Sequence, residues 1–350
     1  MFNRILIPLD GSTLAERSIP HAEQFARIFG SSIVLLQVLE PTSYHENPNP
    51  VDPLGWQIRK VEANMYMYGV AARIRENLNE GGREKKISVE YSIREGKTAE
   101  NIVDFAHDDK IDLLVISTHG SGGLSRWNIS SVIQKVINLI YLPVLIVRAY
   151  NQSGTDDARI RYRRILLPID SSRRAEYSLP AGIALARGET SMGYASEADN
   201  PPPHHSASDT SSLNTKLVLA AVIKPPELCI PEPYPVEIAQ LSEQLVQVSR
   251  GTVRDYLNEM TKRLPVECET RVVESNSVAS AIQRLAEQQD IDLVVLTAHG
   301  YTGLSTRPYG NVTRDYMEHG TKPVLVIQDI PRSQVQRTAA EIAAEESGRR

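Results

Sequence analysis

The stretch that decides the fold occurs twice in this chain: residues 4–12 read RILIPLDGS, and residues 164–172 read RILLPIDSS. Each copy is an aliphatic run that leads into proline and aspartate, which is typical of a buried strand followed by a turn. The two copies are offset by 160 residues, and the match continues as far as Pro20 and Pro180. A continuous match of this length indicates an internal repeat.

A second pair of matching segments lies further along the chain. Residues 111–120 (IDLLVISTHG) match 291–300 (IDLVVLTAHG), and residues 143–147 (PVLIV) match 323–327 (PVLVI), both at an offset of 180 residues. The chain has 350 residues, about twice the commonest domain size. We therefore interpret it as two copies of one domain, with extra residues in the second copy.

The composition indicates where the domains begin and end. We expect the first domain at 1–149, a polar linker at 150–160, the second domain at 161–330 and a polar C-terminal tail at 331–350. Residues 188–215 are rich in Pro, Ser, Asp and Gly and poor in large apolar side chains. This composition predicts that the extra residues of the second domain form a mobile loop.

Within each half, short aliphatic runs alternate with longer segments of helical spacing. In the first half we expect strands at 3–9, 32–39, 87–93, 112–117 and 143–147, and helices at 13–29, 56–80, 98–108 and 130–141. In the second half we expect strands at 163–169, 216–223, 267–274, 292–297 and 323–328, and helices at 173–187, 235–263, 277–288 and 311–318. This alternation predicts an α/β fold, a five-stranded parallel sheet in each half with helices on both faces. Pro20 and Pro180 fall inside the first helices, where we expect a kink.

Charge and composition exclude several classes of protein. The formal net charge is −5 and the two signs are interspersed, so we expect neither nucleic acid nor an anionic membrane as a partner. No apolar run approaches the length that spans a bilayer, and the N-terminal apolar run is too short for a signal peptide, so we expect the cytoplasm.

Cysteine and histidine do not form a metal-binding pattern. Cys229 and Cys268 are the two cysteines, and neither has a CxxC neighbourhood, so the sequence indicates no disulfide framework and no zinc site. His204 and His205 lie in the polar stretch of the second half, and we interpret them as solvated loop residues. We expect no metal site in the protein itself.

The ends of the strands carry the candidate binding groups. In an open parallel sheet, ligands bind outside the carboxyl ends of the strands, at the point where the strand order reverses. Asp10 and Asp170 follow the first strands, and Gly120 and Gly300 follow the fourth. A carboxylate accepts hydrogen bonds from ribose hydroxyls, and a glycine-rich loop before a helix offers amides to phosphate. Each element alone is also typical of a turn or cap, but both recur at matching places in both halves.

The strand-Pro-x-Asp opening, the late strand ending in His-Gly, the Gly-Leu-Ser loop and the closing Pro-Val-Leu strand together resemble the universal stress protein family across nearly the whole chain. The resemblance implies two tandem Rossmann-like domains of the adenine nucleotide alpha hydrolase type, related by a pseudo-twofold axis. It also implies ATP, with or without Mg²⁺, as the ligand. Members that bind ATP carry G-x2-G-x9-G-[ST] between the fourth strand and the fourth helix, where amides and a hydroxyl hold the phosphates.

Both halves depart from that motif. The first half has Ser117, Gly120, Ser130 and Ser131, so two of the three glycines have become serine. We expect the Cβ of Ser130 to penalise a positive φ and to crowd a phosphate, which would weaken the site without abolishing it.

The second half keeps the last two glycines of the motif. Its match is Thr297, Gly300, Gly310 and Asn311, so the first glycine and the hydroxyl residue are lost. We favour the first half as the better nucleotide site.

The resemblance implies the following site residues, with both valines at the strand ends acting through backbone groups. In the first half they are Pro8, Leu9, Asp10, Val38, Ser117, Gly120, Ser130, Ser131 and Val132. In the second half they are Pro168, Ile169, Asp170, Val222, Thr297, Gly300, Gly310, Asn311 and Val312.

His119 and His299 stand beside the glycines and invite a catalytic interpretation. No Ser or Cys nucleophile with an orienting acid is visible around them in the sequence, so we favour a structural role for both and expect no catalytic residue.

Three functions remain open. The favoured one is an ATP-binding stress-response or regulatory protein with little or no turnover, although slow hydrolysis is compatible with it. The second is a nucleotide-free interaction scaffold whose loops have lost ATP. The third, less favoured, is a nucleotidyl transferase or adenylating ligase, for which the sequence has no Walker A motif.

The last strand of each half would leave an apolar sheet edge open if the domain were isolated. The resemblance to family dimers implies that strands 143–147 and 323–327 pair with each other inside one chain. A further homodimer and an unknown protein partner stay open.

Overall fold

The computed structural model describes residues 1–41, 53–79, 86–119, 129–149, 160–198, 215–227, 235–301 and 307–330. The first half contains β1 (Arg4–Pro8), α1 (Thr13–Glu16), α2 (Ile19–Phe29), β2 (Ser32–Leu39), α3 (Pro53–Asn79), β3 (Val89–Glu95), α4 (Thr98–Asp108), β4 (Leu113–Ser117), α5 (Ser131–Leu139) and β5 (Val144–Val147). The second half contains β6 (Arg164–Pro168), the 3₁₀ turn η1 (Ala175–Ser178), α6 (Leu179–Ala198), β7 (Lys216–Ile223), α7 (Val236–Arg263), β8 (Cys268–Glu274), α8 (Val278–Gln288), β9 (Leu293–Thr297), α9 (Asn311–His319) and β10 (Val324–Ile327).

The strands form one continuous sheet in the order β3-β2-β1-β4-β5-β10-β9-β6-β7-β8. Within each half the strands are parallel, and the first strand lies between the second and the fourth. The point where strand order reverses is therefore between β1 and β4, and between β6 and β9. The parallel α/β fold expected from the repeat is confirmed.

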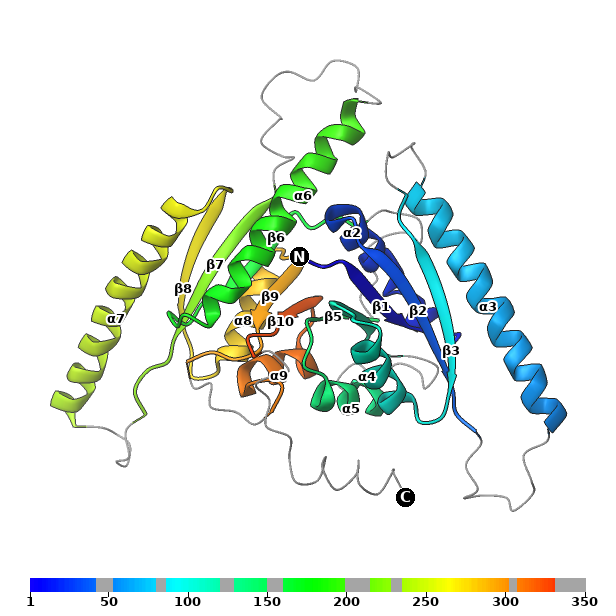
Figure 1. Cartoon of the computed structure of the whole chain (residues 1–350). Helices are drawn as coiled ribbons and strands as arrows, with labels where there is room; N and C mark the ends of the chain where they lie inside the picture. The colour runs from blue at the N-terminus through cyan, green and yellow to red at the C-terminus, as the bar shows by residue number, and fades with distance from the viewer. Residues whose placement is uncertain are drawn as a thin grey trace.

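The two halves meet at the last strand of each. β5 and β10 are antiparallel neighbours, with Leu145 opposite Leu325. Figure 1 shows these two strands side by side in the middle of the molecule and α3 and α7 at its two outer sides. The pairing expected between 143–147 and 323–327 corresponds to this junction, which gives both strands a hydrogen-bonded neighbour instead of an open edge.

Helices cover both faces of the sheet. One core cluster joins the sheet to α2 and α3 of the first half and to α6 and α7 of the second. The other joins the opposite face to α4, α5, α8 and α9. Because both faces are covered, a strand such as β1 is apolar on each side, and Ile5, Leu6 and Ile7 are all completely buried.

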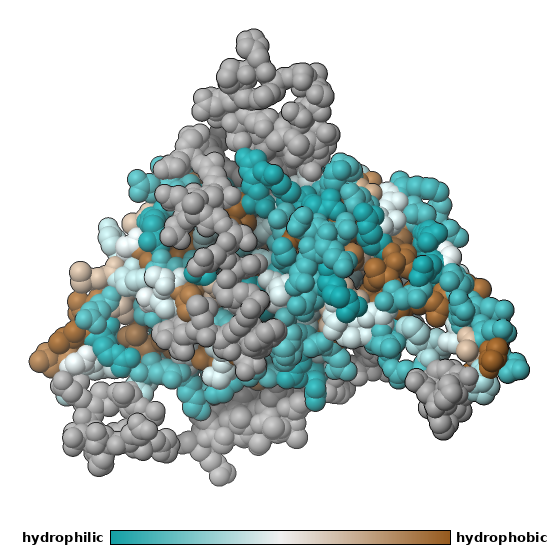
Figure 2. Space-filling view, turned by 180° about the vertical axis from the view of Figure 1, so that it is seen from behind, coloured by the Kyte–Doolittle hydropathy of each residue, from teal (hydrophilic) through white to brown (hydrophobic). Residues whose placement is uncertain are grey.

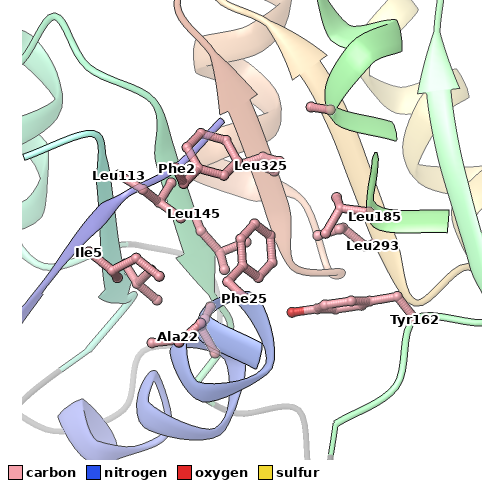
Figure 3. Packing of buried hydrophobic residues seen from close by; sticks show 14 of the residues in the cluster. Phe2, Ile5, Ala22, Phe25, Leu113, Leu145, Tyr162, Leu185, Leu293 and Leu325 are labelled. Atoms are coloured by element: carbon pink, nitrogen blue, oxygen red, sulfur yellow. The ribbon is translucent and has the colours of Figure 1, made fainter. Parts of the chain in front are cut away.

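The first core cluster runs through the junction between the halves. The rings of Phe25 on α2 and Tyr162, just before β6, meet edge to face with their centroids 6.0 Å apart. Figure 3 shows this pair among buried side chains of both halves. The Tyr162 hydroxyl also lies 2.7 Å from Nδ1 of His21, and both side chains are buried. The halves thus share a core as well as a sheet.

The first helix of each half is broken, but not where the sequence analysis placed the kink. The structure has α1 and then α2 with Ser18 between them, and Pro20 is the second residue of α2. In the second half the turn η1 precedes α6, whose second residue is Pro180. Proline lacks an N–H, which the first turn of a helix does not use, so it begins a new helix instead of bending an old one.

The predicted loop at 188–215 is wrong at its start. Helix α6 continues to Ala198, so residues 188–198 are helical. Composition misled the prediction here because the helix ends in small and polar residues that are equally common in loops. Residues 199–214 of the predicted loop, residues 150–159 of the linker and the whole of the tail at 331–350 lie outside the described residues.

The outer helices are covered on one side only. On α3, Met67 and Ile74 face the sheet and are completely buried, whereas Leu54 and Met65 are exposed. Figure 2 shows a largely hydrophilic surface with hydrophobic residues gathered toward the outer edges, where α3 and α7 lie. Over the described part of the chain, no helix has the length and apolar character needed to cross a membrane.

Candidate functional site

The first candidate group follows β1. Oδ1 of Asp10 accepts hydrogen bonds from the Ser12 amide at 3.0 Å and from its hydroxyl at 2.6 Å. Gly11 between them has φ +84°, a conformation that a Cβ disfavours. Ser12 in turn accepts a hydrogen bond from the amide of Ala15 and caps α1. Strand end, turn and cap together hold the Asp10 carboxylate at the carboxyl edge of the sheet.

The second group lies between β4 and α5. Ser130 is the N-cap of α5, and its Oγ accepts a hydrogen bond from the amide of Ile133 at 3.3 Å. Its own amide donates to the carbonyl of Thr118 at 3.1 Å, which ties the start of α5 to the end of β4. The next residues, Ser131 and Val132, begin the helix, where amides have no intrahelical partner and attract anions.

The predicted effect of Ser130 on the backbone is wrong. Ser130 has φ −62° and ψ 152°, and Gly310, its counterpart in the second half, has φ −70° and ψ 166°. Both lie in the extended region, which any residue adopts, so serine costs no backbone strain here. Serine instead contributes the side-chain cap that Gly310 lacks.

These groups line one cavity of about 700 Å³. Every described residue predicted for the first half lines it: Pro8, Leu9, Asp10, Val38, Ser117, Ser130, Ser131 and Val132. Gly120 lies outside the described residues. The cavity therefore collects residues from β1, β2, β4 and α5, at the place where the strand order reverses.

Three buried polar atoms of the cavity lining have no hydrogen-bond partner among the residues that the structure describes. They are Oγ of Ser117, Nε2 of His119 and Oε1 of Gln37. Native proteins pair almost all such atoms, and leaving one unpaired costs about 1–3 kcal/mol. A cavity bordered by three of them is suited to a polar ligand.

The sequence analysis missed a wall of this cavity. Arg59, Glu62, Ala63 and Tyr66 of α3 line it. Burial and a hydrogen bond to Glu16 raise the pKa of Tyr66, so its hydroxyl stays protonated at neutral pH. No motif marks these residues because the contact depends on where a long helix crosses the sheet.

The charges that the described residues place around the cavity are mainly negative. Asp10, Glu40 and Glu62 contribute carboxylates, and Arg59, whose guanidinium stacks 5.3 Å from the ring centre of Trp56, contributes a positive charge. The Glu40 carboxylate accepts a hydrogen bond from the first amide of α4, at Thr98, at 2.7 Å. This bond holds the pKa of Glu40 below its usual range, so Glu40 is ionised at neutral pH.

In the second half the aspartate bonds to the loop after β9. Asp170 accepts hydrogen bonds from the amide of Ser172 at 3.0 Å and from that of Tyr301 at 2.7 Å. Gly300 lies so close that a Cβ there would be 2.2 Å from Oδ2 of Asp170. A side chain at 300 would therefore force the Asp170 carboxylate to move.

The other predicted residues of the second half lie at corresponding places. They are Pro168 and Ile169 at the end of β6, Val222 near the end of β7, Thr297 at the end of β9, Gly310 as N-cap of α9, and Asn311 and Val312 in its first turn. The Gly310 amide donates to the carbonyl of Ala298 at 2.8 Å, which joins α9 to β9 as Ser130 joins α5 to β4.

The two histidines differ. His299 is buried, with Nδ1 2.8 Å from Asp329 and Nε2 3.0 Å from the carbonyl of Arg307. Its ring therefore connects the segment before α9 to the segment after β10. His119 lines the cavity, and its Nδ1 lies 3.0 Å from the Thr118 hydroxyl. The structural role expected from sequence describes His299 well, whereas Nε2 of His119 has no partner among the described residues, which do not include the counterpart of Arg307.

The described residues contain no group of three His, Cys, Asp or Glu side chains that could hold a metal ion. His204, His205 and Cys229 lie outside those residues. Burial and the neighbouring Glu267 raise the pKa of Cys268 to about 11, so its thiol is protonated and unreactive at neutral pH.

The family model of the universal stress proteins matches residues 1–148 and 161–328. A universal stress protein of Methanocaldococcus jannaschii is 29% identical over 159 residues, which are 42% of this chain and 83% of that protein. One of Synechocystis is 30% identical over 147 residues, 42% of this chain and 86% of that protein. Each relative thus corresponds to one half of this chain.

Solved structures resemble the whole chain. The crystal structure of a universal stress protein from Archaeoglobus fulgidus superimposes with a TM-score of 0.57 at 14% identity, and the match covers 93% of this chain and 96% of that one. At this identity the similarity concerns the fold, which is shared over both halves.

Proposed function

The chain belongs to the universal stress protein family, and we propose that it binds ATP in the cavity of its first half as a stress-response or regulatory protein with little or no turnover. The observation that carries the proposal is the set of three buried polar atoms at that cavity without a partner among the described residues, Gln37 Oε1, Ser117 Oγ and His119 Nε2. A bound nucleotide would supply hydrogen-bonding groups to all three.

The order of the groups along the edge of the sheet matches the order of the parts of a nucleotide. Neighbouring strands lie about 4.8 Å apart, so β2, β1 and β4 together span roughly 10 Å. Asp10, after the middle strand, is placed to accept hydrogen bonds from ribose hydroxyls. The amides of Ser131 and Val132 at the start of α5, beyond β4, would receive the phosphates. The base would then lie over β2.

The negative lining bears on the form in which ATP would bind. Among the described residues of the lining, Asp10, Glu40 and Glu62 contribute three carboxylates against the one guanidinium of Arg59, and these carboxylates would repel a bare triphosphate. A nucleotide that carries Mg²⁺ has part of its charge neutralised. We therefore propose that the ion arrives with the nucleotide and is held mainly by its phosphates.

Little or no turnover is proposed because the described lining offers no activated nucleophile. The Thr118 hydroxyl and His119 are 3.0 Å apart, but the other nitrogen of His119 contacts no orienting carboxylate among the described residues. In the second half His299 does contact a carboxylate, that of Asp329, but its other nitrogen is bonded to the carbonyl of Arg307.

The experiment is a titration of thermal stability with ATP, AMP and GTP, with wild type, Asp10→Ala and the matched variant Asp170→Ala. A ligand that binds only the folded state, present at 100 times its Kd, raises the free energy of unfolding by about 2.7 kcal/mol. We expect ATP to stabilise wild type and Asp170→Ala, and to stabilise Asp10→Ala much less. If ATP fails to stabilise Asp170→Ala but stabilises Asp10→Ala, the nucleotide site lies in the second half. If ATP stabilises none of the three proteins, the nucleotide-free scaffold becomes the favoured function. Release of phosphate at more than a few turnovers per hour would contradict a binding role.

A further inference from the structure

We infer that Gln37 selects the base: its side-chain amide recognises adenine in preference to guanine. The inference rests on the nucleotide site proposed above and names the residue that would make that site specific. No sequence motif points to Gln37, and it becomes notable only in the folded chain.

Gln37 carries a buried side-chain oxygen that lacks a hydrogen-bond partner in the described part of the chain. It stands in β2 with 9% of its surface exposed, next to Leu36, which is completely buried. Its Oε1 has no hydrogen-bond partner among the described residues, and the side chain lines the cavity. An unpaired amide oxygen in an apolar strand destabilises a fold, so Oε1 calls for a partner that the described residues do not supply.

The second half shows that the fold does not need this amide. Pro8 of β1 is paired with Leu36, and Pro168 of β6 is paired with Ala220 in the same register. The residue that follows is Gln37 in the first half and Ala221 in the second, and both are buried. β2 and β7 have the same burial pattern along their whole length, so a small apolar residue is compatible with this position.

The position of Gln37 suits contact with the base. Side chains alternate along a strand, and Leu35, two residues earlier, belongs to the core cluster on the face of α2 and α3. Gln37 points to that same face, where Ala63 and Tyr66 of α3 line the cavity. β1 separates β2 from β4, so Gln37 lies on the far side of Asp10 from the start of α5. A nucleotide with its ribose at Asp10 and its phosphates at α5 places its base over β2.

A carboxamide distinguishes the two purines by its donor and acceptor pair. Adenine presents an amino donor next to a ring-nitrogen acceptor, which matches the oxygen and the NH₂ of glutamine. Guanine presents two acceptors on the same edge, and these leave the glutamine oxygen unpaired. Such a bidentate contact discriminates between bases by about tenfold or more.

The test measures Kd for ATP and GTP by isothermal titration in wild type, Gln37→Ala and Gln37→Glu, with Ala221→Gln as the matched control in the second half. Gln37→Ala gives the first half the residue that the second half already has, so we expect it to fold. We expect wild type to bind ATP at least about tenfold more tightly than GTP. In Gln37→Ala we expect that ratio to fall to about one, with the Kd for GTP changed less than about threefold.

Gln37→Glu keeps the shape but replaces the donor with an acceptor. We expect it to weaken the binding of ATP, since the carboxylate cannot donate to a ring nitrogen of adenine. Ala221→Gln should leave the ratio measured for the first site unchanged. If Gln37→Ala keeps the wild-type ratio of the Kd values for GTP and ATP, the inference about Gln37 is wrong, but the proposal of an ATP site is unaffected. A wild-type protein that binds neither nucleotide would overturn both.

Discussion

The guanidinium of Arg148, just after β5 in the first half, donates a hydrogen bond of 2.9 Å to the carbonyl of Met317 near the end of α9 in the second half. It also donates to the carbonyls of Tyr316 and Lys322, and only 3% of the residue is exposed. The carbonyls at the end of a helix lack intrahelical partners and carry partial negative charge. One buried cation therefore completes a helix of the other half.

We expect Arg148→Ala to destabilise the protein strongly. The change removes three hydrogen bonds to carbonyls and opens a void between the halves, so the free energy of unfolding should fall by about 3 kcal/mol. Urea unfolding measures the change. The matched variant is Gln328→Ala, at the corresponding place in the second half, where the amide donates within its own domain to Pro308. That variant should cost about 1 kcal/mol. Equal losses in the two variants would contradict the special role of Arg148.

Acid should weaken the protein through His21. Burial lowers the pKa of His21 to about 4 from an ordinary value of 6.5. The folded state therefore keeps His21 neutral where the unfolded state takes up a proton, and stability is lost as the pH falls from 6.5 to 4. The expected loss attributable to this residue is about 3 kcal/mol. Free energies of unfolding from urea titrations at pH 4, 5, 6 and 7 measure it.

Two variants separate the charge from the hydrogen bond. His21→Gln cannot titrate, so its stability should vary less with pH over that range. Tyr162→Phe removes the hydroxyl 2.7 Å from Nδ1 but keeps the site buried, so it should lose about 1 kcal/mol at neutral pH and retain the acid sensitivity. The assignment to His21 would be wrong if His21→Gln showed the full wild-type dependence.

Gly300→Ala should destabilise the second half through Asp170. The new Cβ would lie 2.2 Å from Oδ2, so the carboxylate must move and give up its bond to the amide of Tyr301. We expect a loss of about 2 kcal/mol. In an Asp170→Ala background the same change should cost less than about 0.5 kcal/mol, because the obstructing oxygens are gone. A double-mutant cycle by urea unfolding measures the coupling, and additive losses would show that the two residues do not interfere.

Ser171→Gly should stabilise the protein. Ser171 has φ +62°, whereas its counterpart in the first half is Gly11 with φ +84°. A side chain in this left-handed region costs about 1–2 kcal/mol, which is partly offset by the greater freedom of glycine in the unfolded chain. We expect a gain of about 0.5–1 kcal/mol, and a loss of similar size from the reverse change, Gly11→Ser. Calorimetric melting of both variants should show shifts of opposite sign.

Much of the fold followed from local patterns. The aliphatic runs that lead into Pro8 and Pro168 predicted the first strand of each half, and the repeat predicted that both halves share one topology. The loop predicted from residue 188 was wrong because a helix ending in small polar residues has the composition of a loop. The backbone penalty expected at Ser130 was wrong because φ at a helix N-cap is extended, which a motif does not reveal.

The sequence predicted only part of the candidate site. Asp10, Ser117 and Ser130 stand at strand and helix ends, which hydrophobic periodicity locates, and the structure brings them to one cavity. Arg59 and Tyr66 of α3 could not be placed there, because the crossing of a long helix over a sheet depends on packing along its whole length.

Sequence alone was sufficient for the tandem repeat, the parallel α/β architecture and the strand ends that carry the candidate binding groups, because these are encoded by neighbours along the chain. Tertiary structure was needed to show that the buried Oε1 of Gln37, a residue of the cavity lining, has no partner among the described residues, and that Arg148 completes a helix of the other half. Those facts depend on contacts between residues far apart in the chain, and such contacts exist only after the sheet order and the docking of the halves are set.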